Sequence, residues 1–392
     1  MTCVTCPCCD GSNLLELVRI EAVPVLCNVL HQNAAEARGA DRGDLDLIYC
    51  RTCAHLWNGA FDPDRVAYDA DYENSLHYSP RFQEWARGLS ADLVASYGLQ
   101  GGTVVEIACG KGDFLGLLRE AGASRAVGFD PSWESNRDGA TSPDGVEVRR
   151  ELFTASTAGD LTCDLLCCRH ALEHIGDPVA FLQLVHDSLT ASPKAPIYFE
   201  VPNGLWTLRD LGIWDLIYEH PQYFSACSLL RAMNRAGFEV TGIDEAFGGQ
   251  FLSCRAIRSE HPGASIKVPL DDPEELGDRF GAAYREHRTR WADRLLEWRR
   301  RGSRAIIWGA GSKGVTFLNV IGAGVEIAAV VDINPHKQGR FVPGSGHRVV
   351  SPAEIAGLNV DIVVVMNPLY RDEIAATLAA LNCRLEILTV DS

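Results

Sequence analysis

The chain has 392 residues, of which 46% are hydrophobic, and this length allows two or three domains that each bury a core. Its 36 basic and 52 acidic residues give a net charge of −16, which argues against a nucleic-acid partner. No apolar run approaches the roughly 20 residues of a membrane span, and no signal peptide opens the chain. We therefore expect a cytoplasmic protein, monomeric or homodimeric, whose 14 cysteines are reduced or bind metal.

Two Cys-x2-Cys pairs near the N-terminus predict a metal site. They are Cys6 with Cys9 and Cys50 with Cys53. Two such pairs supply four thiolates for a tetrahedral zinc ion, and a set closed in this way has a structural role. Cys3 and Cys8 are alternative ligands, and four unpaired cysteines are the simpler interpretation. The sequence predicts a zinc-binding domain over residues 1–66 that contains a β-hairpin at 14–29.

A polar and aromatic segment separates this domain from a helix expected at residues 81–97. Tyr72, Asn74 and His77 are clustered there, in a stretch too irregular for a strand. Side chains of this kind on a loop beside a binding domain can line or close a pocket. The alternative is a surface linker that its tyrosines anchor to the core.

The stretch around Glu106 has the pattern of a strand, a glycine turn and a helix start. Residues 104–107 are apolar apart from Glu106, and Gly110 and Gly112 follow before a helical run. Backbone N–H groups in such a turn approach a ligand closely because glycine has no Cβ. A second short strand ends at Asp130, where a carboxylate can accept both hydroxyls of a ribose. The alternatives are a phosphate-binding NAD fold or a turn without a ligand.

Three further strands are expected at residues 146–149, 163–168 and 197–203. The second of these runs into the segment Arg169 to His174, which reads R-H-A-L-E-H. His170 follows the strand end and is expected to face the same ligand. His174 lies four residues further on, where it could share that face or pack in the core. The order of these residues is wrong for a metal-binding H-E-x-x-H helix.

The segment at residues 204–225 carries the candidate catalytic group. Its apolar residues follow a helical spacing and end at Tyr218-Glu219-His220, and Pro221 then breaks the helix. His220 is therefore expected at a turn with its ring free, and histidine suits proton removal near neutral pH. Glu219 could orient that ring, and Tyr218 could donate a hydrogen bond to an oxyanion. The alternative is a structural histidine.

Two strands at residues 238–243 and 248–257 are expected to complete the core, with Gln250 beside two glycines. Residues 261–302 are predicted to form a linker and a long helix at 273–301. The apolar stripe of that helix should lie across both flanking domains.

Residues 303–392 begin with a strand and the pattern Gly309-x-Gly311-x-x-Gly314, and Asp332 ends a second strand. This is a dinucleotide-binding fingerprint. A third strand is expected at residues 360–366. The roughly ninety residues of this unit are, however, about half of a full dinucleotide fold.

The glycine turn with Glu106 and Asp130 resembles motif I and the following acidic position of class I S-adenosylmethionine (SAM) methyltransferases, with Ala108 in place of the first glycine. Together with the cysteine pairs, the Tyr-Glu-His segment and the C-terminal unit, it resembles the three-domain sugar C-methyltransferase family over nearly the whole chain. The resemblance implies an α/β fold in which a class I methyltransferase, with a Rossmann-like doubly wound sheet, lies between a small zinc-binding domain and a C-terminal Rossmann-like domain. The methyltransferase core would cover residues 67–260, and the substrate-binding C-terminal domain residues 303–392.

The resemblance also implies which residues bind each ligand. SAM would contact the glycine turn and the neighbouring strand ends at Glu106, Ala108, Cys109, Gly110, Gly112, Phe114, Asp130, Pro131, Leu152, Phe153, Arg169 and His170. The substrate, a nucleotide-linked keto-sugar, would contact Tyr72, Asn74, His77, Asn203, Gln250, Lys313, Asn319 and Lys337. The C-terminal domain would then hold the nucleotide of the sugar and not NAD.

These predictions combine into one mechanism. His220 removes the proton next to a ketone, Tyr218 stabilises the enolate oxygen, and the carbanion attacks the sulfonium methyl group. A second hypothesis is O- or N-methylation, in which His220 deprotonates a hydroxyl or an amine of a sugar or another natural product. A third is a non-catalytic scaffold with a zinc module and two ligand-binding folds.

Overall fold

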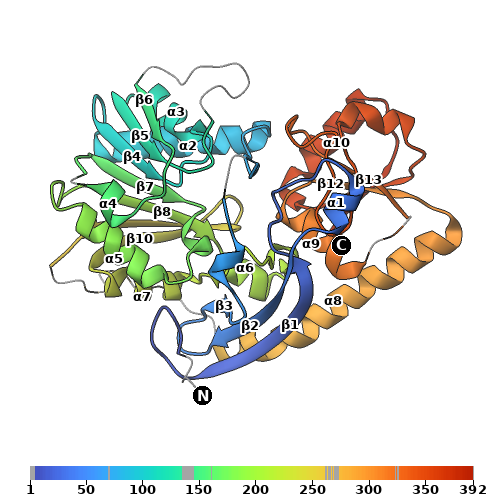
Figure 1. Ribbon diagram of the computed structural model, residues 1–392, viewed down its shortest axis with the longest axis horizontal. Helices are drawn as coiled ribbons and strands as arrows, with labels where there is room; N and C mark the ends of the chain where they lie inside the picture. The colour runs from blue at the N-terminus through green and yellow to red at the C-terminus, as the bar shows by residue number, and fades with distance from the viewer. Residues whose placement is uncertain are drawn as a thin grey trace.

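The computed structural model describes residues 5–68, 71–134, 145–159, 161–260, 263, 266, 268, 273–322, 324 and 326–391. These residues form three β-sheets with helices around them, and Figure 1 shows the sheets as neighbouring lobes. None of the described helices combines the length and apolar character needed to cross a membrane. The domain boundaries predicted from the sequence stay predictions.

The first sheet is antiparallel and has the order β1-β2-β3-β9. Its strands are β1 (Leu14–Pro24), β2 (Arg42–Cys50), β3 (Leu56–Asn58) and β9 (Gln222–Tyr223). The predicted hairpin at residues 14–29 is wrong, because β1 is one long strand that pairs with β2. Helix α1 (Ala34–Arg38) lies between these two strands. Because β9 directly follows the Tyr-Glu-His segment, this sheet holds that segment in place.

The central sheet has the order β10-β11-β8-β7-β4-β5-β6. Its parallel strands are β4 (Thr103–Ile107), β5 (Arg125–Phe129), β6 (Val146–Arg149), β7 (Leu165–Arg169) and β8 (Ile197–Pro202). Strands β10 (Phe238–Ala246) and β11 (Phe251–Arg258) are antiparallel. The predicted α/β fold with a doubly wound sheet is thereby confirmed. The strand order reverses between β4 and β7, and ligands of such sheets bind at the carboxyl ends of the strands beside that point.

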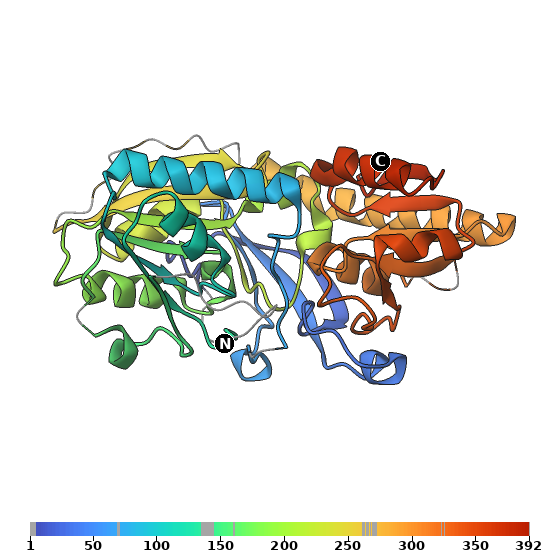
Figure 2. The same cartoon turned by 90° about the horizontal axis from the view of Figure 1, so that it is seen from above.

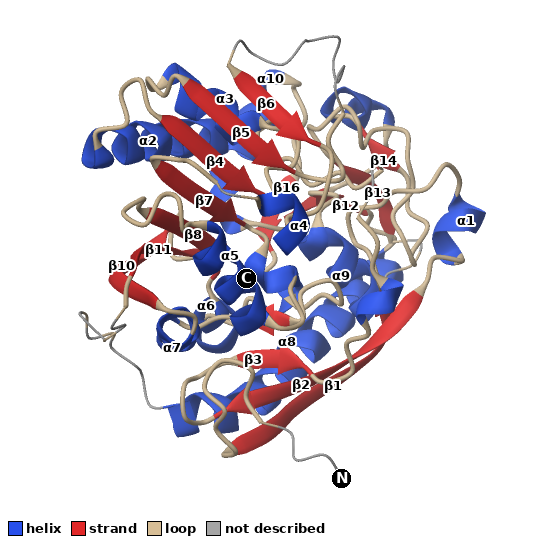
Figure 3. Cartoon of the chain, turned by 60° about the vertical axis from the view of Figure 1, so that its left-hand side comes forward, coloured by secondary structure: helices blue, strands red, loops and turns tan. Residues whose placement is uncertain are grey.

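Helices cover both faces of the central sheet (Figures 2 and 3). They are α2 (Pro80–Tyr97), α3 (Asp113–Glu120), α4 (Ala155–Ala158), α5 (Pro178–Ser188) and α7 (Ala226–Arg235). Val104 packs in one core with α2 and α3, whereas its neighbour Val105 packs in another core with α5 and α7. This alternation follows from the two-residue period of a strand, and it explains why the parallel strands are apolar on both sides.

The third sheet is parallel and has the order β14-β13-β12-β15-β16. Its strands are β12 (Ala305–Trp308), β13 (Ile327–Val331), β14 (Val349–Val350), β15 (Ile362–Val365) and β16 (Glu386–Thr389), with helices α9 (Ser312–Ile321) and α10 (Arg371–Ala380). Sequence analysis found β12, β13 and β15 but missed the two edge strands, which are short or only partly buried.

The long helix α8 (Pro273–Arg301) packs against β1, α9 and helix α6 (Gly204–Arg209). Figure 1 shows it running from beside the first sheet to the right, below the third lobe. Its predicted apolar stripe is confirmed, since Phe280, Tyr284, Trp291, Leu295 and Trp298 are buried in one core with residues of both sheets. The continuous helix expected after residue 204 is wrong, because α6 ends at Arg209 and Leu211 has a positive φ of 55°.

Candidate active site

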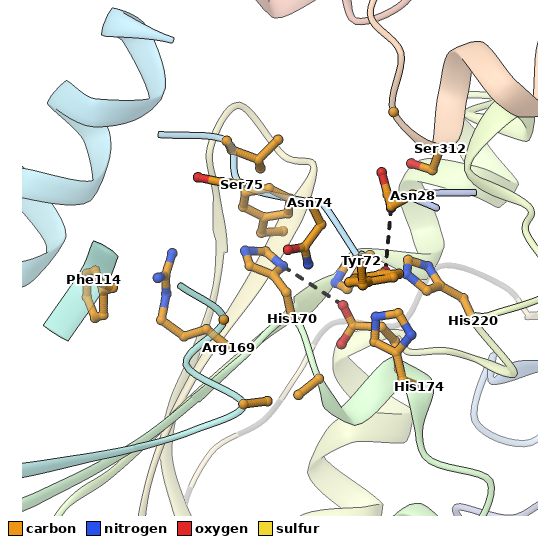
Figure 4. A pocket seen from close by; sticks show the side chains of 18 of the residues that line it. Asn28, Tyr72, Asn74, Ser75, Phe114, Arg169, His170, His174, His220 and Ser312 are labelled. Carbon is orange, nitrogen blue, oxygen red and sulfur yellow. Dashed lines mark hydrogen bonds and ion pairs between the residues drawn. The ribbon is translucent and has the colours of Figure 1, made fainter. Parts of the chain in front are cut away.

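A cavity of about 380 Å³ lies where the three lobes meet. Its wall combines the carboxyl ends of the central strands with Asn28 from the N-terminal part and residues 311–313 from the glycine turn before α9. The volume lies in the range of small-molecule sites, about 300–1,000 Å³. Figure 4 shows Arg169 toward one end of this cavity and His220 toward the other.

The predicted glycine turn forms one end of the cavity. Ala108 and Gly110 have positive φ angles of 54° and 55°, which turn the chain between β4 and α3. A Cβ built on Gly110 would meet no atom within 4 Å, so the turn leaves open space for a ligand. One carboxylate oxygen of Asp130 accepts a hydrogen bond from the Gly110 amide at 2.8 Å, and the other accepts one from the Ser132 amide at 2.8 Å. Asp130 therefore ties the end of β5 to the turn while it borders the cavity.

A buried arginine lies beside this turn. Arg169 donates a hydrogen bond from Nη2 to Glu200 at 3.0 Å, its Nη1 lies 3.9 Å from Glu106, and its guanidinium group lies 4.0 Å from the centre of the Phe114 ring. Burial raises the pKa of Glu106 to about 7, although Arg169 opposes this shift. His170 places Nε2 2.8 Å from the same Glu200 carboxylate. The cavity thus has a buried cation at this end, where a ligand carboxylate would be attracted.

The remaining predicted cofactor residues divide into two groups. The cavity wall includes Cys109, Pro131 and Leu152. Leu152 is 62% exposed, so its apolar side chain is accessible to a ligand. Phe153 does not border it, because its ring packs edge to face on Phe129 in the core at 5.3 Å. Successive residues of an extended segment point in opposite directions, so the two neighbours cannot both face one ligand. Gly112 also lies outside the wall and serves as the N-cap of α3 with a φ of 83°.

The other end of the cavity holds a pair of histidines. His174 and His220 pack edge to face with ring centres 4.5 Å apart (Figure 4). Nδ1 of His220 has no hydrogen-bond partner among the described residues. Burial lowers the pKa of His220 well below its ordinary value, and electrostatic interactions with His174, His170 and Lys313 lower it further. His220 is therefore neutral near pH 7 and can accept a proton.

Two groups contact the same ring nitrogen of His174. Its Nδ1 lies 2.8 Å from the backbone carbonyl oxygen of Glu219 and 2.7 Å from the hydroxyl group of Tyr68. Burial lowers the pKa of His174 to about 4. The sequence left open whether His174 faces the ligand or packs, and it does both, since it borders the cavity and fixes the segment before β9.

Glu219 lies behind the cavity wall and not in it. Its carboxylate accepts a hydrogen bond from Asn28 at 3.4 Å, and Asn28 also donates to the Tyr72 hydroxyl group at 3.4 Å. Lys337 donates to the side-chain oxygen of Asn28 at 3.3 Å. Burial raises the pKa of Glu219 to about 8. The side chain of Glu219 thus supports Tyr72 and Asn28, whereas the prediction has it orient the ring of His220.

The prediction that Tyr218 stabilises an oxyanion is wrong. Its side chain is 1% exposed, does not border the cavity, and packs on Phe61. Its hydroxyl group accepts a hydrogen bond from the backbone amide of Asp62 at 2.9 Å. Tyr218 therefore fixes the segment before β9 to residues 61–62 of the N-terminal part.

Most of the predicted substrate residues border the cavity, namely Tyr72, Asn74, His77, Asn203, Gln250, Lys313 and Lys337. Lys313 lies 2.8 Å from the carboxylate of Asp215, and the amides of Gln250 and Asn367 exchange two hydrogen bonds of 2.9 Å between the second and third lobes. Asn319 is an exception. Its amide donates to the carbonyl oxygens of Val315 and Pro343, outside the cavity.

A smaller cavity of about 180 Å³ adjoins the first and shares Ser312, Lys313 and Lys337 with it. It follows the glycine turn of the third sheet as far as Asp332. Asp332 accepts hydrogen bonds from the amides of Ala310 and Asn334, both at 2.8 Å, which is the same arrangement that Asp130 has in the central sheet.

The cavity residues that sequence analysis missed include Asn28, Tyr68 and Glu173, which lie nearest the histidine pair. Glu173 could have been found, because it belongs to the R-H-A-L-E-H segment. No pattern in the sequence distinguishes Asn28 or Tyr68, since only the folded chain brings them to the histidine pair.

The predicted cysteine cluster forms as expected. The Sγ atoms of Cys6, Cys9, Cys50 and Cys53 all lie within 4.8 Å of one another. Two of the Sγ separations, Cys6 to Cys53 and Cys9 to Cys50, are 3.6 Å. A tetrahedral ion with metal–sulfur bonds of about 2.3 Å requires sulfur atoms about 3.8 Å apart, so this set fits one. Cys8 is buried nearby but does not belong to the cluster, and Cys3 lies outside the described residues.

Two family models match the chain: a methyltransferase domain over residues 79–242 and a C-methyltransferase C-terminal domain over residues 268–384. The C-methyltransferase NovU of Streptomyces niveus is 27% identical over 389 residues, which is 94% of this chain and 90% of that protein. A tRNA U34 carboxymethyltransferase of Dichelobacter nodosus is 26% identical over 238 residues, 59% of this chain and 73% of that protein.

Among solved structures, an S-adenosylmethionine-dependent methyltransferase from Mesorhizobium loti covers 43% of this chain and 98% of its own, with 21% identity and a TM-score of 0.34. The two domain models in their order and the near full-length match to a C-methyltransferase agree with the cavity at the switch point of the central sheet. The chain belongs to the three-domain C-methyltransferase family and is a SAM-dependent methyltransferase.

Proposed function

We propose that this enzyme methylates a carbon atom next to the ketone of a nucleotide-linked sugar, with His220 as the general base. The observation that carries the proposal is one continuous cavity. It reaches from the glycine turn at Asp130 to His220 and on to Lys313 in the third lobe. A cofactor and an elongated substrate could meet in such a cavity beside the histidine.

The cofactor end fits SAM. Asp130 is positioned to accept the ribose hydroxyl groups, and the exposed Leu152 offers an apolar surface for the adenine ring. Arg169 supplies a buried cation for the carboxylate of the methionine part. When bound, SAM would supply an electrophilic methyl group on its sulfonium sulfur.

The third lobe fits a nucleotide. Helix α9 begins at Gly311 without a side-chain cap, so its first N–H groups can face an anion. Lys313 and Lys337 border the cavity at the same place, and they offset locally the negative charge of the chain. Diphosphate is the anion that such a turn with two lysines would bind, as the sequence resemblance also implies.

The proposal also includes a structural zinc ion bound by the four cysteines, and the short distances between their Sγ atoms support it.

The proposed chemistry begins with proton removal. His220 is neutral because burial and electrostatic interactions with neighbouring groups lower its pKa, and its free Nδ1 can accept the proton next to the ketone. Tyr68 and Tyr223 pack edge to face on the two histidines, and an aromatic wall of this kind would limit the access of water to a short-lived enolate. Most of the rate enhancement would come from the positioning of two reactants in one enclosed space.

The test is solvent-deuterium exchange into a nucleotide-linked keto-sugar, followed with and without SAM by NMR and mass spectrometry. Wild-type enzyme should exchange the proton next to the ketone in the absence of SAM and methylate that carbon in its presence. His220→Asn should bind SAM normally but lose both activities by about 10²–10⁴-fold, because asparagine cannot accept the proton. Methylation at oxygen or nitrogen, without exchange at carbon, would instead support the second hypothesis. If exchange persists in His220→Asn, the general base would instead be His77, His170 or His174.

A further inference from the structure

With Tyr218 outside the cavity, the enolate oxygen of the proposed reaction lacks its predicted donor. Three tyrosines border the histidine pair, and the hydroxyl group of each already has a partner. Tyr223 donates to the backbone carbonyl oxygen of Ile217 at 3.1 Å. Tyr68 is bound to Nδ1 of His174 at 2.7 Å. Tyr72 accepts a hydrogen bond from Asn28. It also donates one to the carboxylate of Glu219, and this bond lowers the pKa of Glu219, against the larger effect of burial. A side chain with an unpaired polar atom beside the histidine pair is therefore better suited to face the oxygen.

Glu173 is well placed for this role. It lies in the short 3₁₀ turn Leu172–His174 directly after β7, and its side chain borders the cavity although it is only 1% exposed. Its Oε2 has no hydrogen-bond partner among the described residues. Polar atoms of Glu173, His174 and His220 all lie within 4.8 Å of one another.

The surroundings of Glu173 keep its carboxyl group protonated near pH 7. Burial raises its pKa to about 8, and the negative charge of Glu200 adds to this shift. Nδ1 of His170 lies 3.9 Å from Oε1, too far for a strong ion pair. The titratable and charged groups that surround the site are Tyr68, Cys168, Arg169, His170, His174, Glu200, Glu219, His220 and, beyond His220, Lys313. Arg169 is engaged with Glu200 and is not among the groups that lower the pKa of Glu173.

We propose that Glu173 is the catalytic acid that donates a hydrogen bond to the enolate oxygen while His220 holds the proton taken from the carbon. The inference rests on the proposed function. The reacting carbon and the ketone oxygen are separated by one carbon atom, so the two groups that serve them must lie a few ångströms apart, as Glu173 and His220 do.

Enolate formation moves one proton and two electron pairs and needs no oxidant or reductant. The C–H bond breaks, its proton goes to His220, and its electron pair forms the C=C bond as the ketone π pair moves to oxygen. Glu173 shares its proton with that oxygen. When the carbon takes up the methyl group, the methyl–sulfur bond of SAM would break and leave its electron pair on the sulfur, which becomes a neutral thioether. The C=O bond then forms again and Glu173 keeps its proton. His220 then releases the proton of the substrate to solvent.

The test compares Glu173→Gln and Glu173→Leu with wild type, by the same deuterium exchange without SAM and by kcat between pH 6 and 10. Leucine cannot donate, so Glu173→Leu should lose about 10²–10³-fold in both reactions, which is the usual effect of a lost oxyanion donor. Glutamine keeps a neutral donor, so Glu173→Gln should lose less.

The pH profile separates catalysis from structure. Glu173 donates only when protonated, so wild-type activity should fall as pH rises through about 8. Glu173→Gln should lack this alkaline limb. Glu219→Gln is the matched control, because the pKa of Glu219 is also raised to about 8 but its carboxyl group lies outside the cavity. The alkaline limb should persist in that variant.

SAM affinity within about twofold of wild type shows that each variant is folded. The inference is overturned if Glu173→Gln keeps the limb, if Glu219→Gln loses it, or if activity requires an added divalent cation. It is also overturned if folded Glu173→Leu exchanges deuterium at the wild-type rate. The proposed function fails separately, when wild-type enzyme shows no exchange or His220→Asn retains it.

Discussion

Asp130→Ala should weaken SAM binding about 10- to 150-fold. The carboxylate that would accept the two ribose hydroxyl groups is lost, and two charge-assisted hydrogen bonds contribute roughly 1.5–3 kcal/mol. The same carboxylate accepts amide hydrogen bonds from Gly110 and Ser132 at 2.8 Å and one from the Ser132 hydroxyl group at 2.6 Å. Alanine frees the glycine turn from these contacts, so the loss should lie toward the upper end of the range.

Isothermal titration calorimetry with SAM measures this effect directly. Asp332→Ala is the matched control, because Asp332 has the same two amide contacts at the end of β13 in the third lobe. That variant should bind SAM within about twofold of wild type. An Asp130→Ala affinity that close to wild type would refute the argument, and Asp130 would then only terminate a strand.

Three other changes test separate parts of the molecule. Cys50→Ser with Cys53→Ser should release about one zinc ion per chain by elemental analysis while SAM still binds, and a retained ion would rule out this ligand set. Tyr218→Phe should lower stability by about 1 kcal/mol in thermal unfolding, because the Asp62 amide loses its acceptor. Its kcat should stay within about twofold of wild type, and a larger loss would return Tyr218 to the reaction. Lys313→Met should raise KM for the nucleotide-linked sugar. It should also move the acidic limb of the kcat profile to higher pH, because Lys313 lowers the pKa of His220. If the acidic limb does not move, Lys313 does not influence the pKa of His220.

Local sequence patterns were sufficient to predict those parts of the site whose residues lie close together in the chain. The glycine turn, Asp130 at the end of a buried strand and the two Cys-x2-Cys pairs have fixed spacings, so their geometry follows from the short segments that carry them. The α/β fold was predictable for the same reason, since parallel strands buried on both faces are continuous apolar runs.

The arrangement of side chains around His220 depended on contacts between distant segments. Tyr218 and His220 are two residues apart, yet one anchors the N-terminal part and the other borders the cavity. Leu152 and Phe153 diverge in the same way. The direction in which each of these side chains points is set by the layers that pack on either side of it, and the spacing along the chain does not contain that information.

The sequence by itself determined the three-part organisation, the cofactor turn and the candidate base. Only the tertiary structure decided which groups surround that base, since Asn28, Tyr68 and Glu173 come from three separate segments. Their roles also depend on burial, which removes water from the carboxyl group of Glu173 and raises its pKa to about 8. A residue type reveals that a group can titrate, but its protonation state at pH 7 follows from desolvation and neighbouring charge, and these exist only once the chain has folded.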